Sequence, residues 1–369
     1  MSKFKIVQMV PALGWGGAQV FAIQLCNELI KNPDYDVTLV SMYHHTEAHL
    51  PISHLNPRIK FRSMGKHKGF DFSMFGAIKK MIREEKPDVV HTHLHAGYYC
   101  FDAFLNVTEF PFKKIHTLHN LAQKESPLHG RLAYNFFFKR NIITPVSISD
   151  EVLLSAQKAY DGSAKILILN GSYPVKISNE FEAVKEKINA LKKNSETKVL
   201  LNVARICKQK NQLLLLESMR QLQDENIIAL VLGHHLPDDK ALYDELIAKK
   251  PDNVHFMGKT QEVGDYYLQS DAFVLTSIFE GLPISSLEAM SAGIIPICTP
   301  VGGLKNIVTK DIGFLSDEVS VQSFTKAVKQ YLSLSVEDAS ALQQNNKLLY
   351  QQKFSMESCT AQYDKLYHN

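Results

Sequence analysis

The chain has 369 residues, 45% of them hydrophobic, and a formal net charge of +3. This length and hydrophobic content are enough for two domains with separate cores, and so small a charge gives no indication of nucleic-acid binding. The five cysteines are widely spaced without a CxxC pair, which favours reduced thiols over a disulfide framework or a cysteine metal site.

Strands and helices alternate along the whole chain, which predicts parallel sheets with helices on both faces. The N-terminal segment meets Pro11 and a glycine cluster early, so it is typical of a first strand rather than a signal peptide. No apolar run reaches transmembrane length, and we expect a cytoplasmic protein. The predicted strands are Lys5–Val10, Val37–Ser41, Asp88–His93, Lys114–Leu118, Ile142–Ser147, Ile166–Leu169, Lys198–Ala204, Ile227–Gly233, Val254–Gly258, Ala272–Thr276 and Ile294–Thr299.

A glycine-rich loop, Leu13 to Gln19, follows the first predicted strand. Gly16 and Gly17 would let the backbone approach a ligand at the start of the next helix. A dinucleotide fold would require a complete GxGxxG pattern and an acidic residue at the end of the second strand, where this chain has Val40-Ser41-Met42. The loop therefore argues against NAD, and a plain tight turn is the alternative.

Two patterns in the first half imitate metal sites. His91, His93 and His95 alternate along and just past a strand, so their side chains could share one face as metal ligands do. The Asp34-Tyr35-Asp36 triplet imitates a metal-binding DxD motif, but we predict that it lies in a loop before the second strand. We expect no metal, since metal-binding histidines also need hydrogen-bond partners that orient their rings, and the sequence does not show such partners.

His119 differs from the other histidines because it directly follows the strand Lys114–Leu118. Ligands of open parallel sheets bind beyond the carboxyl ends of the strands, so His119 is placed to meet one. A structural histidine with a local hydrogen bond is the alternative.

The segment Leu132 to Arg140, LAYNFFFKR, combines three phenylalanines with a Lys-Arg pair. Aromatic and basic residues together favour a membrane interface, which would place the protein peripherally at the inner face of the membrane. We prefer the other interpretation, a helix that precedes the strand at Ile142 and buries one or two phenylalanines, because an interfacial helix needs an apolar face over several turns.

A domain boundary is predicted between Gly171 and Lys198, where Pro174 precedes a charged helical stretch. We expect residues 1–172 to form an N-terminal Rossmann-like domain and residues 173–350 a C-terminal one. Their parallel sheets would face a central cleft. Residues 351–369 are predicted to form a C-terminal helix entered through Phe354-Ser355.

Two cations follow the first strand of the second half. Arg205 ends the run Leu200–Ala204, and Lys210 follows five residues later, before a predicted helix Gln212–Met219. Fixed cations at such a strand end would stabilise the negative charge of a departing phosphate. Ordinary exposed basic residues are the alternative.

The segment from Ser277 to Gly293 sets Glu280 and Glu288 eight residues apart around a Gly-Leu-Pro turn. Gly281 permits a tight turn and Pro283 stands where a helix would begin, so Glu280 lies in the turn and Glu288 on the helix. The first N–H groups of that helix lack intrahelical partners and would bind an anion such as a diphosphate, leaving the carboxylates for hydroxyl groups.

Together these landmarks resemble the retaining GT-B glycosyltransferases, in particular glycosyltransferase family 4, whose E-x7-E motif matches Glu280 to Glu288. The chain departs from the family after Gly233, where a second glycine is usual and His234-His235 stand, and at Asn306, where an acidic residue is usual. These departures weaken any assignment of base and sugar. The matching landmarks are Gly16-Gly17, Asn170-Gly171, Arg205, Lys210, the segment Glu280–Glu288, Gly302-Gly303 and Phe354-Ser355.

The resemblance implies that the N-terminal domain, residues 1–172, binds the acceptor and the C-terminal domain, residues 173–350, binds the nucleotide-sugar donor. It also implies the roles of the matching residues. Glu288 would hold the ribose hydroxyls of the donor and Glu280 its sugar, with His119 near the reacting centre and Arg205 and Lys210 on the leaving phosphate. The backbone that would cradle sugar and phosphate comprises Gly281, Leu282, Pro283, Ile284 and Ser285, and the glycine loop adds Gly16 and Gly17.

The expected function is transfer of a sugar from a nucleotide-sugar donor, UDP in preference to other nucleotides, to a saccharide or lipid-linked acceptor, with retention and in bacterial polysaccharide biosynthesis. No cofactor, metal or nucleic acid is expected. Two alternatives stay open at this point: a sugar-nucleotide epimerase or hydrolase of the same fold, and a non-catalytic saccharide-binding protein.

Overall fold

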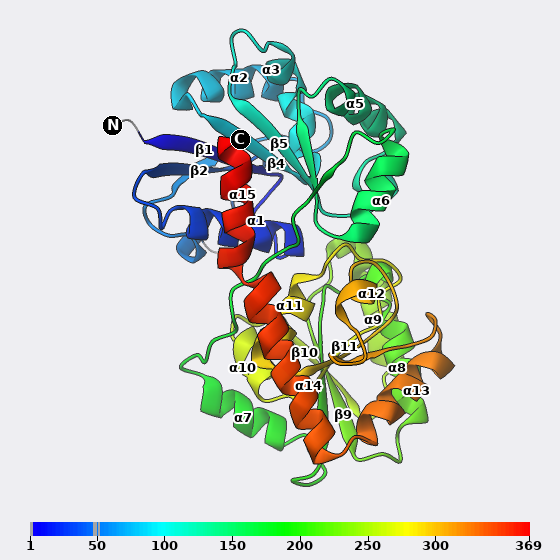
Figure 1. Cartoon of the computed structure of the whole chain (residues 1–369). Coiled ribbons are helices and arrows are strands. Elements are labelled where there is room, and N and C mark those ends of the chain that lie inside the picture. Colours follow the sequence, from blue (N-terminus) through cyan, green and yellow to red (C-terminus); the bar gives the residue numbers. More distant parts are fainter. Residues whose placement is uncertain (1–2, 47–49, 51) are drawn as a thin grey trace. The chain divides into compact units, whose positions relative to one another are not determined.

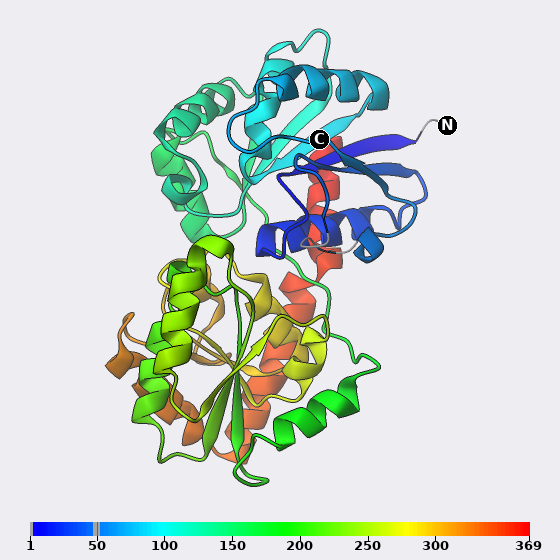
Figure 2. The ribbon, with the colours of Figure 1, turned by 180° about the vertical axis from the view of Figure 1, so that it is seen from behind.

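The computed structural model describes residues 3–46, 50 and 52–369. It divides the chain into two compact units, each built around its own parallel sheet (Figures 1 and 2). The first unit comprises Met1–Ser172 and Met356–Asn369, and the second Tyr173–Ser355. We predicted that the C-terminal segment begins at residue 351, but Tyr350–Phe354 forms a π-helical turn that continues the preceding helix, so the second unit extends to Ser355.

The first unit holds a sheet in the order β3-β2-β1-β4-β5-β6-β7, and all of its paired strands are parallel. The strand order reverses between β1 and β4, which makes the carboxyl ends of these two strands the natural place for a ligand. The strands are β1 (Phe4–Val10), β2 (Tyr35–Ser41), β3 (Lys60–Ser63), β4 (Val89–His93), β5 (Lys113–Leu118), β6 (Thr144–Ser147) and β7 (Ile166–Leu167).

Helices cover the sheet of the first unit, and the last helix of the chain is among them (Figure 1). That helix, α15 (Met356–His368), packs beside α1 (Gly17–Leu29), and its first N–H donates to Ser172 O at 3.0 Å. The other helices are α2 (Ser73–Glu85), α3 (Phe101–Leu105), α4 (Ala122–Glu125), α5 (Leu128–Lys139) and α6 (Asp150–Ala159), with 3₁₀ turns η1 (Ile52–His54) and η2 (Leu94–Cys100).

The second unit repeats the plan with a parallel sheet in the order β10-β9-β8-β11-β12-β13. Its order reverses between β8 and β11, again defining a ligand position. The strands are β8 (Lys198–Val203), β9 (Ile227–Leu232), β10 (Val254–Gly258), β11 (Ala272–Leu275), β12 (Ile295–Cys298) and β13 (Phe314–Leu315). The helices are α7 (Phe181–Asn189), α8 (Gln212–Gln221), α9 (Lys240–Lys249), α10 (Val263–Leu268), α11 (Ile284–Ala292), α12 (Leu304–Ile307), α13 (Val321–Leu332) and α14 (Val336–Leu349), with short turns η3 (Lys208–Lys210), η4 (Pro237–Asp239) and η5 (Tyr350–Phe354).

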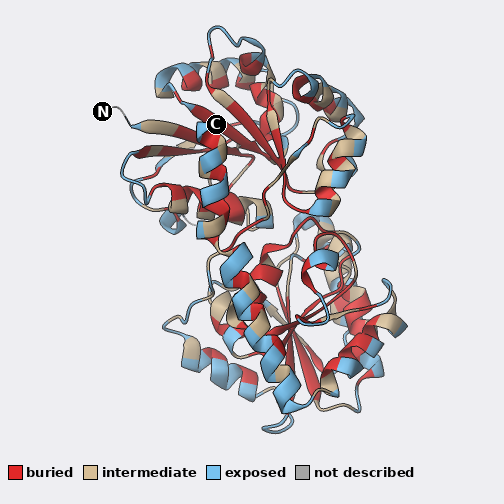
Figure 3. Ribbon diagram, in the orientation of Figure 1, coloured by how far each residue is buried: buried red, intermediate tan, exposed pale blue. Residues whose placement is uncertain are grey.

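The central strands are buried on both faces (Figure 3), and the continuous apolar sequences of β9 and β11 predict this, whereas β4 also buries His91, Thr92 and His93. Helices α6, α13 and α14 begin after serines whose side-chain oxygens accept a backbone N–H of the first turn. β3 and β13 are absent from the sequence prediction. Both are short strands at sheet edges: β3 has four residues, of which one is apolar, and β13 has only two residues.

One predicted loop is wrong. Tyr35 and Asp36 of the DxD-like triplet are the first residues of β2 and not part of a loop. The Asp36 carboxylate pairs with Lys60 of the neighbouring strand at 3.0 Å, and the Tyr35 hydroxyl donates to Asp364 of α15. These groups therefore act in sheet pairing and helix docking.

Helix α5 contains the phenylalanine-rich segment and has two apolar faces. Tyr134, Phe137 and Phe138 are buried against the unit, as the preferred interpretation required. Leu128 and Leu132 on the opposite face are 64% and 63% exposed. Nowhere in the described ranges is a helix long and apolar enough to span a bilayer.

Candidate active site

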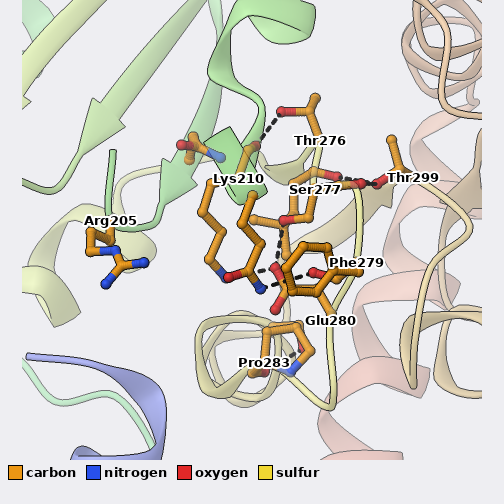
Figure 4. Close-up of polar contacts among 12 residues, drawn as sticks. Arg205, Lys210, Thr276, Ser277, Phe279, Glu280, Pro283 and Thr299 are labelled. Carbon is orange, nitrogen blue, oxygen red and sulfur yellow. Dashed lines mark hydrogen bonds and ion pairs between the residues drawn. The ribbon is translucent and has the colours of Figure 1, made fainter. Parts of the chain in front are cut away.

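The switch point of the second sheet brings Lys210 and Glu280 together. Lys210 closes the turn η3 after β8, and Glu280 lies in the loop after β11. The Lys210 Nζ atom lies 2.6 Å from Glu280 Oε1, and the two side chains are 17% and 6% exposed (Figure 4). An ammonium group has three donors, so Lys210 can hold Glu280 with one N–H and offer others to an anion.

Several hydrogen bonds join the turn η3 to the loop after β11. Gln209 Nε2 donates to Phe279 O at 2.9 Å, and Ile278 N donates to Gln209 O at 2.9 Å. The Thr276 hydroxyl donates to the backbone carbonyls of residues 210 and 211. These bonds fix both backbones, so the lysine and the glutamate meet in a set geometry rather than as mobile surface side chains.

Ser277 provides a second partner for Glu280, which the sequence analysis missed. Its hydroxyl donates to Glu280 Oε1 at 2.5 Å, and Thr299 Oγ1 in turn donates to Ser277 O at 2.7 Å. Glu280 is therefore oriented by a cation and a hydroxyl while it is almost fully buried. The only sequence signal for this contact was the position of Ser277 three residues before the glutamate.

Two glycines support the backbone of the Glu280 turn. Gly302 has φ +57°, and a Cβ there would lie 2.1 Å from Glu280 O. Gly303 N donates to Gly281 O at 2.6 Å. Only a residue without a side chain allows the two segments to approach so closely.

Arg205 lies two residues after the end of β8 and is exposed. Its carbonyl accepts from Gln212 Nε2 at 3.0 Å, which ties the loop to the start of α8. The backbone after the neighbouring strand approaches this segment closely, because a Cβ on Gly233 would lie only 1.9 Å from Ala204 O. In Figure 4 the Arg205 side chain is set apart from Lys210, and no drawn contact joins it to the Lys210–Glu280 pair.

Helix α11 begins at Ile284 after Pro283, as predicted. Its buried start leaves the early N–H groups of the helix at the strand end, where they would stabilise an anion. Glu288 lies on this helix and accepts from the Tyr267 hydroxyl at 3.2 Å. Burial is the main cause that raises the pKa of the Glu288 carboxyl, to about 7. Glu288 and Glu280 thus have separate partners and different electrostatic settings.

The remaining predicted residues belong to the first unit. Gly16 and Gly17 are exposed at the start of α1, after β1, and a Cβ on Gly16 would lie 2.6 Å from the Gln19 Oε1 atom. His119 follows β5 and is buried, and its Nε2 atom lies 2.9 Å from His93 Nδ1. Burial lowers the pKa of His119 to about 3, so its imidazole is neutral.

The histidines of β4 do not form a metal centre. Both ring nitrogens of His91 and both of His93 lie within hydrogen-bond distance of protein atoms. In the part of the chain that the structure describes, no group of three or more His, Cys, Asp or Glu side chains could hold a metal ion. All five cysteines are buried and unpaired with one another.

Comparison with protein-family models assigns both halves of the chain. Residues 15–147 match the model described as Glycosyltransferase Family 4, and residues 183–349 match the model described as Glycosyl transferases group 1. The chain belongs to glycosyltransferase family 4. The two matches contain Gly16, Gly17, His119 and every predicted site residue of the second unit.

Curated relatives of this family 4 chain include the UDP-Gal:alpha-D-GlcNAc-diphosphoundecaprenol alpha-1,3-galactosyltransferase of Escherichia coli. It is 26% identical over 352 residues, which cover 89% of this chain and 87% of the relative. A putative teichuronic acid biosynthesis glycosyltransferase of Bacillus subtilis is 25% identical, over 68% of this chain and 62% of the relative. The chain is thus a glycosyltransferase similar to enzymes of bacterial glycan synthesis.

Solved structures show that the fold is GT-B. A glycosyltransferase from Rickettsia africae superposes with a TM-score of 0.81 at 21% identity, covering 100% of this chain and 98% of the other. Anabaena HepE, solved in complex with UDP and glucose, superposes with a TM-score of 0.82 at 15% identity, covering 99% and 100%.

Proposed function

We propose that this glycosyltransferase moves a sugar from a UDP-sugar to a saccharide or lipid-linked saccharide acceptor, with retention of anomeric configuration and without a metal ion. The observation that carries the proposal is the buried pairing of Lys210 with Glu280 at the switch point of the second sheet, with Arg205 exposed just after the same strand. Two cations and the start of α11 suit a diphosphate, while Glu280 and Glu288 suit hydroxyl groups.

The chemistry follows from these positions. The bond between the sugar C1 and the phosphate oxygen breaks, and its electron pair leaves with UDP. The acceptor oxygen forms a new bond to C1 on the same face and gives its proton to a departing phosphate oxygen. Arg205 and Lys210 would stabilise the charge that develops on this phosphate, a contribution commonly worth about a hundredfold or more in rate. They would serve in place of a divalent cation, so the proposed reaction proceeds in a chelator.

The donor assignment draws on relatives. The Escherichia coli enzyme is named for UDP-galactose, and HepE was solved with UDP, which supports a uridine nucleotide at this site. The acceptor assignment draws on the diphosphoundecaprenol in the same enzyme's name. The pathway we infer is therefore assembly of a bacterial polysaccharide in the cytoplasm.

A turnover assay tests this proposal. The purified protein is incubated with UDP-galactose, UDP-glucose and UDP-N-acetylglucosamine in EDTA, with and without undecaprenyl-diphosphate-linked saccharides. We expect UDP release that depends on the acceptor and a product with the anomeric configuration of the donor. UDP release that is equally fast without acceptor would identify a hydrolase, and no release with any donor would contradict the proposal.

We also propose that the outer face of α5 contacts the membrane that carries a lipid-linked acceptor. Leu128, Leu132 and Phe136 recur every four residues and are 64%, 63% and 40% exposed, so they form one stripe. Residues 126–149 include Arg131, Lys139 and Arg140 but no Asp or Glu. An apolar stripe flanked by cations fits the interface of an anionic bilayer.

Sedimentation with phosphatidylglycerol vesicles checks this contact. We expect the wild-type protein to bind anionic vesicles in a salt-sensitive manner, and the Leu128→Ser/Leu132→Ser variant to lose most of this binding. Leu154→Ser is the matched control, since Leu154 is 65% exposed on the neighbouring helix α6. Equal binding by the double variant and the control would contradict the assignment of α5.

A further inference from the structure

A chain of buried hydrogen bonds in the first unit runs from the C-terminal helix α15 to His119. It passes through β1 and β4, at the point where the strand order reverses. Every member is buried, with Gln8 and His93 fully so. The successive contacts are Tyr367 Oη to Gln8 Nε2, 2.8 Å; Gln8 Oε1 to His93 Nε2, 2.8 Å; and His93 Nδ1 to His119 Nε2, 2.9 Å.

A second branch of the chain begins at the same tyrosine. The Tyr367 hydroxyl lies 2.8 Å from His91 Nδ1, and His91 Nε2 lies 2.7 Å from Thr117 Oγ1. Thr117 Oγ1 lies 2.9 Å from the hydroxyl of Tyr363, one turn earlier on α15. The helix therefore holds both branches through two tyrosines spaced four residues apart.

The three histidines of this hydrogen-bond network, His91, His93 and His119, are neutral. Burial is the largest cause, and it lowers the pKa of His91 and His93 well below the usual value and that of His119 to about 3. A neutral imidazole has one nitrogen that donates and one that accepts. The direction of one hydrogen bond therefore determines the direction of the next along the chain.

Gln8 determines the direction of the branch toward His119. Its Nε2 donates to Tyr367, so its Oε1 faces His93 and can only accept. His93 must then carry its proton on Nε2, and its Nδ1 accepts a proton donated by His119 Nε2. The Nδ1 atom of His119 is consequently an acceptor.

The second branch agrees with this direction. Tyr367 accepts from Gln8, so its single hydroxyl proton is given to His91 Nδ1. His91 then donates from Nε2 to Thr117, and Thr117 donates to Tyr363. No donor faces a donor at any step, and turning the Gln8 amide over would reverse every bond. One amide side chain thus sets the polarity of the whole network.

We propose that Gln8, His93 and Tyr367 are positioning residues that hold His119 with its proton on Nε2 and its Nδ1 as an acceptor for a hydroxyl of a sugar substrate. The last part, contact with the sugar, rests on the proposed function. The tautomer itself follows from contacts within the first unit. The C-terminal helix therefore has a chemical part in this site in addition to packing on α1.

The proposal is tested by the ring nitrogens of His119 in protein labelled with ¹⁵N-histidine, with His119→Gln used to assign the resonances. In wild-type protein we expect a protonated Nε2 and an unprotonated Nδ1. Gln8→Met keeps the apolar length of the side chain but removes the acceptor of His93, so both tautomers of His119 should be populated. Tyr367→Phe, which removes only the hydroxyl that fixes the Gln8 amide, should have the same effect and provides a second variant if Gln8→Met does not fold.

Tyr35→Phe is the matched control, because the Tyr35 hydroxyl also bonds to α15 but lies outside the chain. It should leave the His119 spectrum unchanged. Gln8→Glu, which still offers an oxygen to His93, should restore the wild-type tautomer. A wild-type His119 protonated on Nδ1, or a spectrum that Gln8→Met and Tyr367→Phe leave unaltered, would overturn the proposal.

Kinetics separates this proposal from the proposed function. Gln8→Met and Tyr367→Phe should lower kcat about three- to tenfold, the effect of one weakened hydrogen bond, while Tyr35→Phe retains wild-type kcat. A changed tautomer with an unchanged kcat would overturn the link to the sugar. If the wild-type protein releases no UDP from any donor, the proposed function fails, whereas the spectrum still decides the tautomer.

Discussion

Replacing Lys210 by methionine tests whether its pairing with Glu280 is both structural and chemical. The substitution removes the ammonium group 2.6 Å from Glu280 Oε1 and leaves the carboxylate with the Ser277 hydroxyl. Breaking a buried ion pair on one side costs about 3–5 kcal/mol. Because the Lys210 side chain is 17% exposed, we expect a smaller loss of unfolding free energy, about 2–3 kcal/mol.

Calorimetry would measure this loss as a shift in the unfolding transition of the second unit. For a unit of this size, about 2–3 kcal/mol corresponds to a decrease in Tm of roughly 4–12 °C. Transfer should fall by about a hundredfold, since a cation on the leaving phosphate is lost. The control is Lys208→Met, which removes an exposed lysine from the same turn.

The double variant Lys210→Met/Glu280→Gln separates the two effects. A neutral amide no longer needs the ammonium group, so the double variant should regain a large part of the lost stability. It should not regain transfer, because the Lys210 ammonium group is still missing from the phosphate and Arg205 alone does not replace it. Wild-type Tm and turnover in Lys210→Met would refute the reasoning, as would recovery of turnover in the double variant.

Two further predictions concern the same site. Because the folded pKa of Glu288, about 7, exceeds the usual value of 4.5, its contribution should lower wild-type stability between pH 4.5 and 7 by up to about 3 kcal/mol. Glu288→Gln should remove this contribution and make the slope of stability against pH shallower in urea titrations, and an unchanged slope would contradict the burial argument. Gly302→Ala should displace the Glu280 backbone and lower both Tm and nucleotide binding. Gly258 also has a positive φ but faces open space, so Gly258→Ala should lower stability by only about 1 kcal/mol in calorimetry. Equal effects of the two substitutions would contradict the close approach of Gly302 to the Glu280 carbonyl.

Much of the fold could be predicted because buried parallel strands appear in the sequence as short runs of apolar residues. The eleven strands named from the sequence all exist, with ends shifted by up to two residues. The two missed strands are short and lie at sheet edges. Asp36 was misjudged because a carboxylate on a strand is uncommon, and its pairing with Lys60 across the sheet is visible only in three dimensions.

The candidate site was predicted residue by residue but not contact by contact. Local patterns identified Lys210 and Glu280, yet their pairing depends on β8 and β11 being neighbours, which no local pattern encodes. The network around His119 was missed for the same reason. Two features of the sequence belong to this network: a glutamine within the apolar first strand, and two tyrosines four residues apart near the C-terminus. The sequence does not show which side chains they contact, because these contacts depend on which strands are neighbours.

The most direct test of the account is calorimetric titration of UDP into the wild-type protein, Arg205→Gln and Lys208→Gln. Arg205 follows the strand at the switch point, and Lys208 is an exposed cation three residues later. We predict that the wild-type protein and Lys208→Gln bind UDP with the same affinity, while Arg205→Gln binds at least about tenfold more weakly. Equal affinity in all three proteins, or no binding of UDP to any of them, would contradict a uridine-diphosphate site at the end of β8.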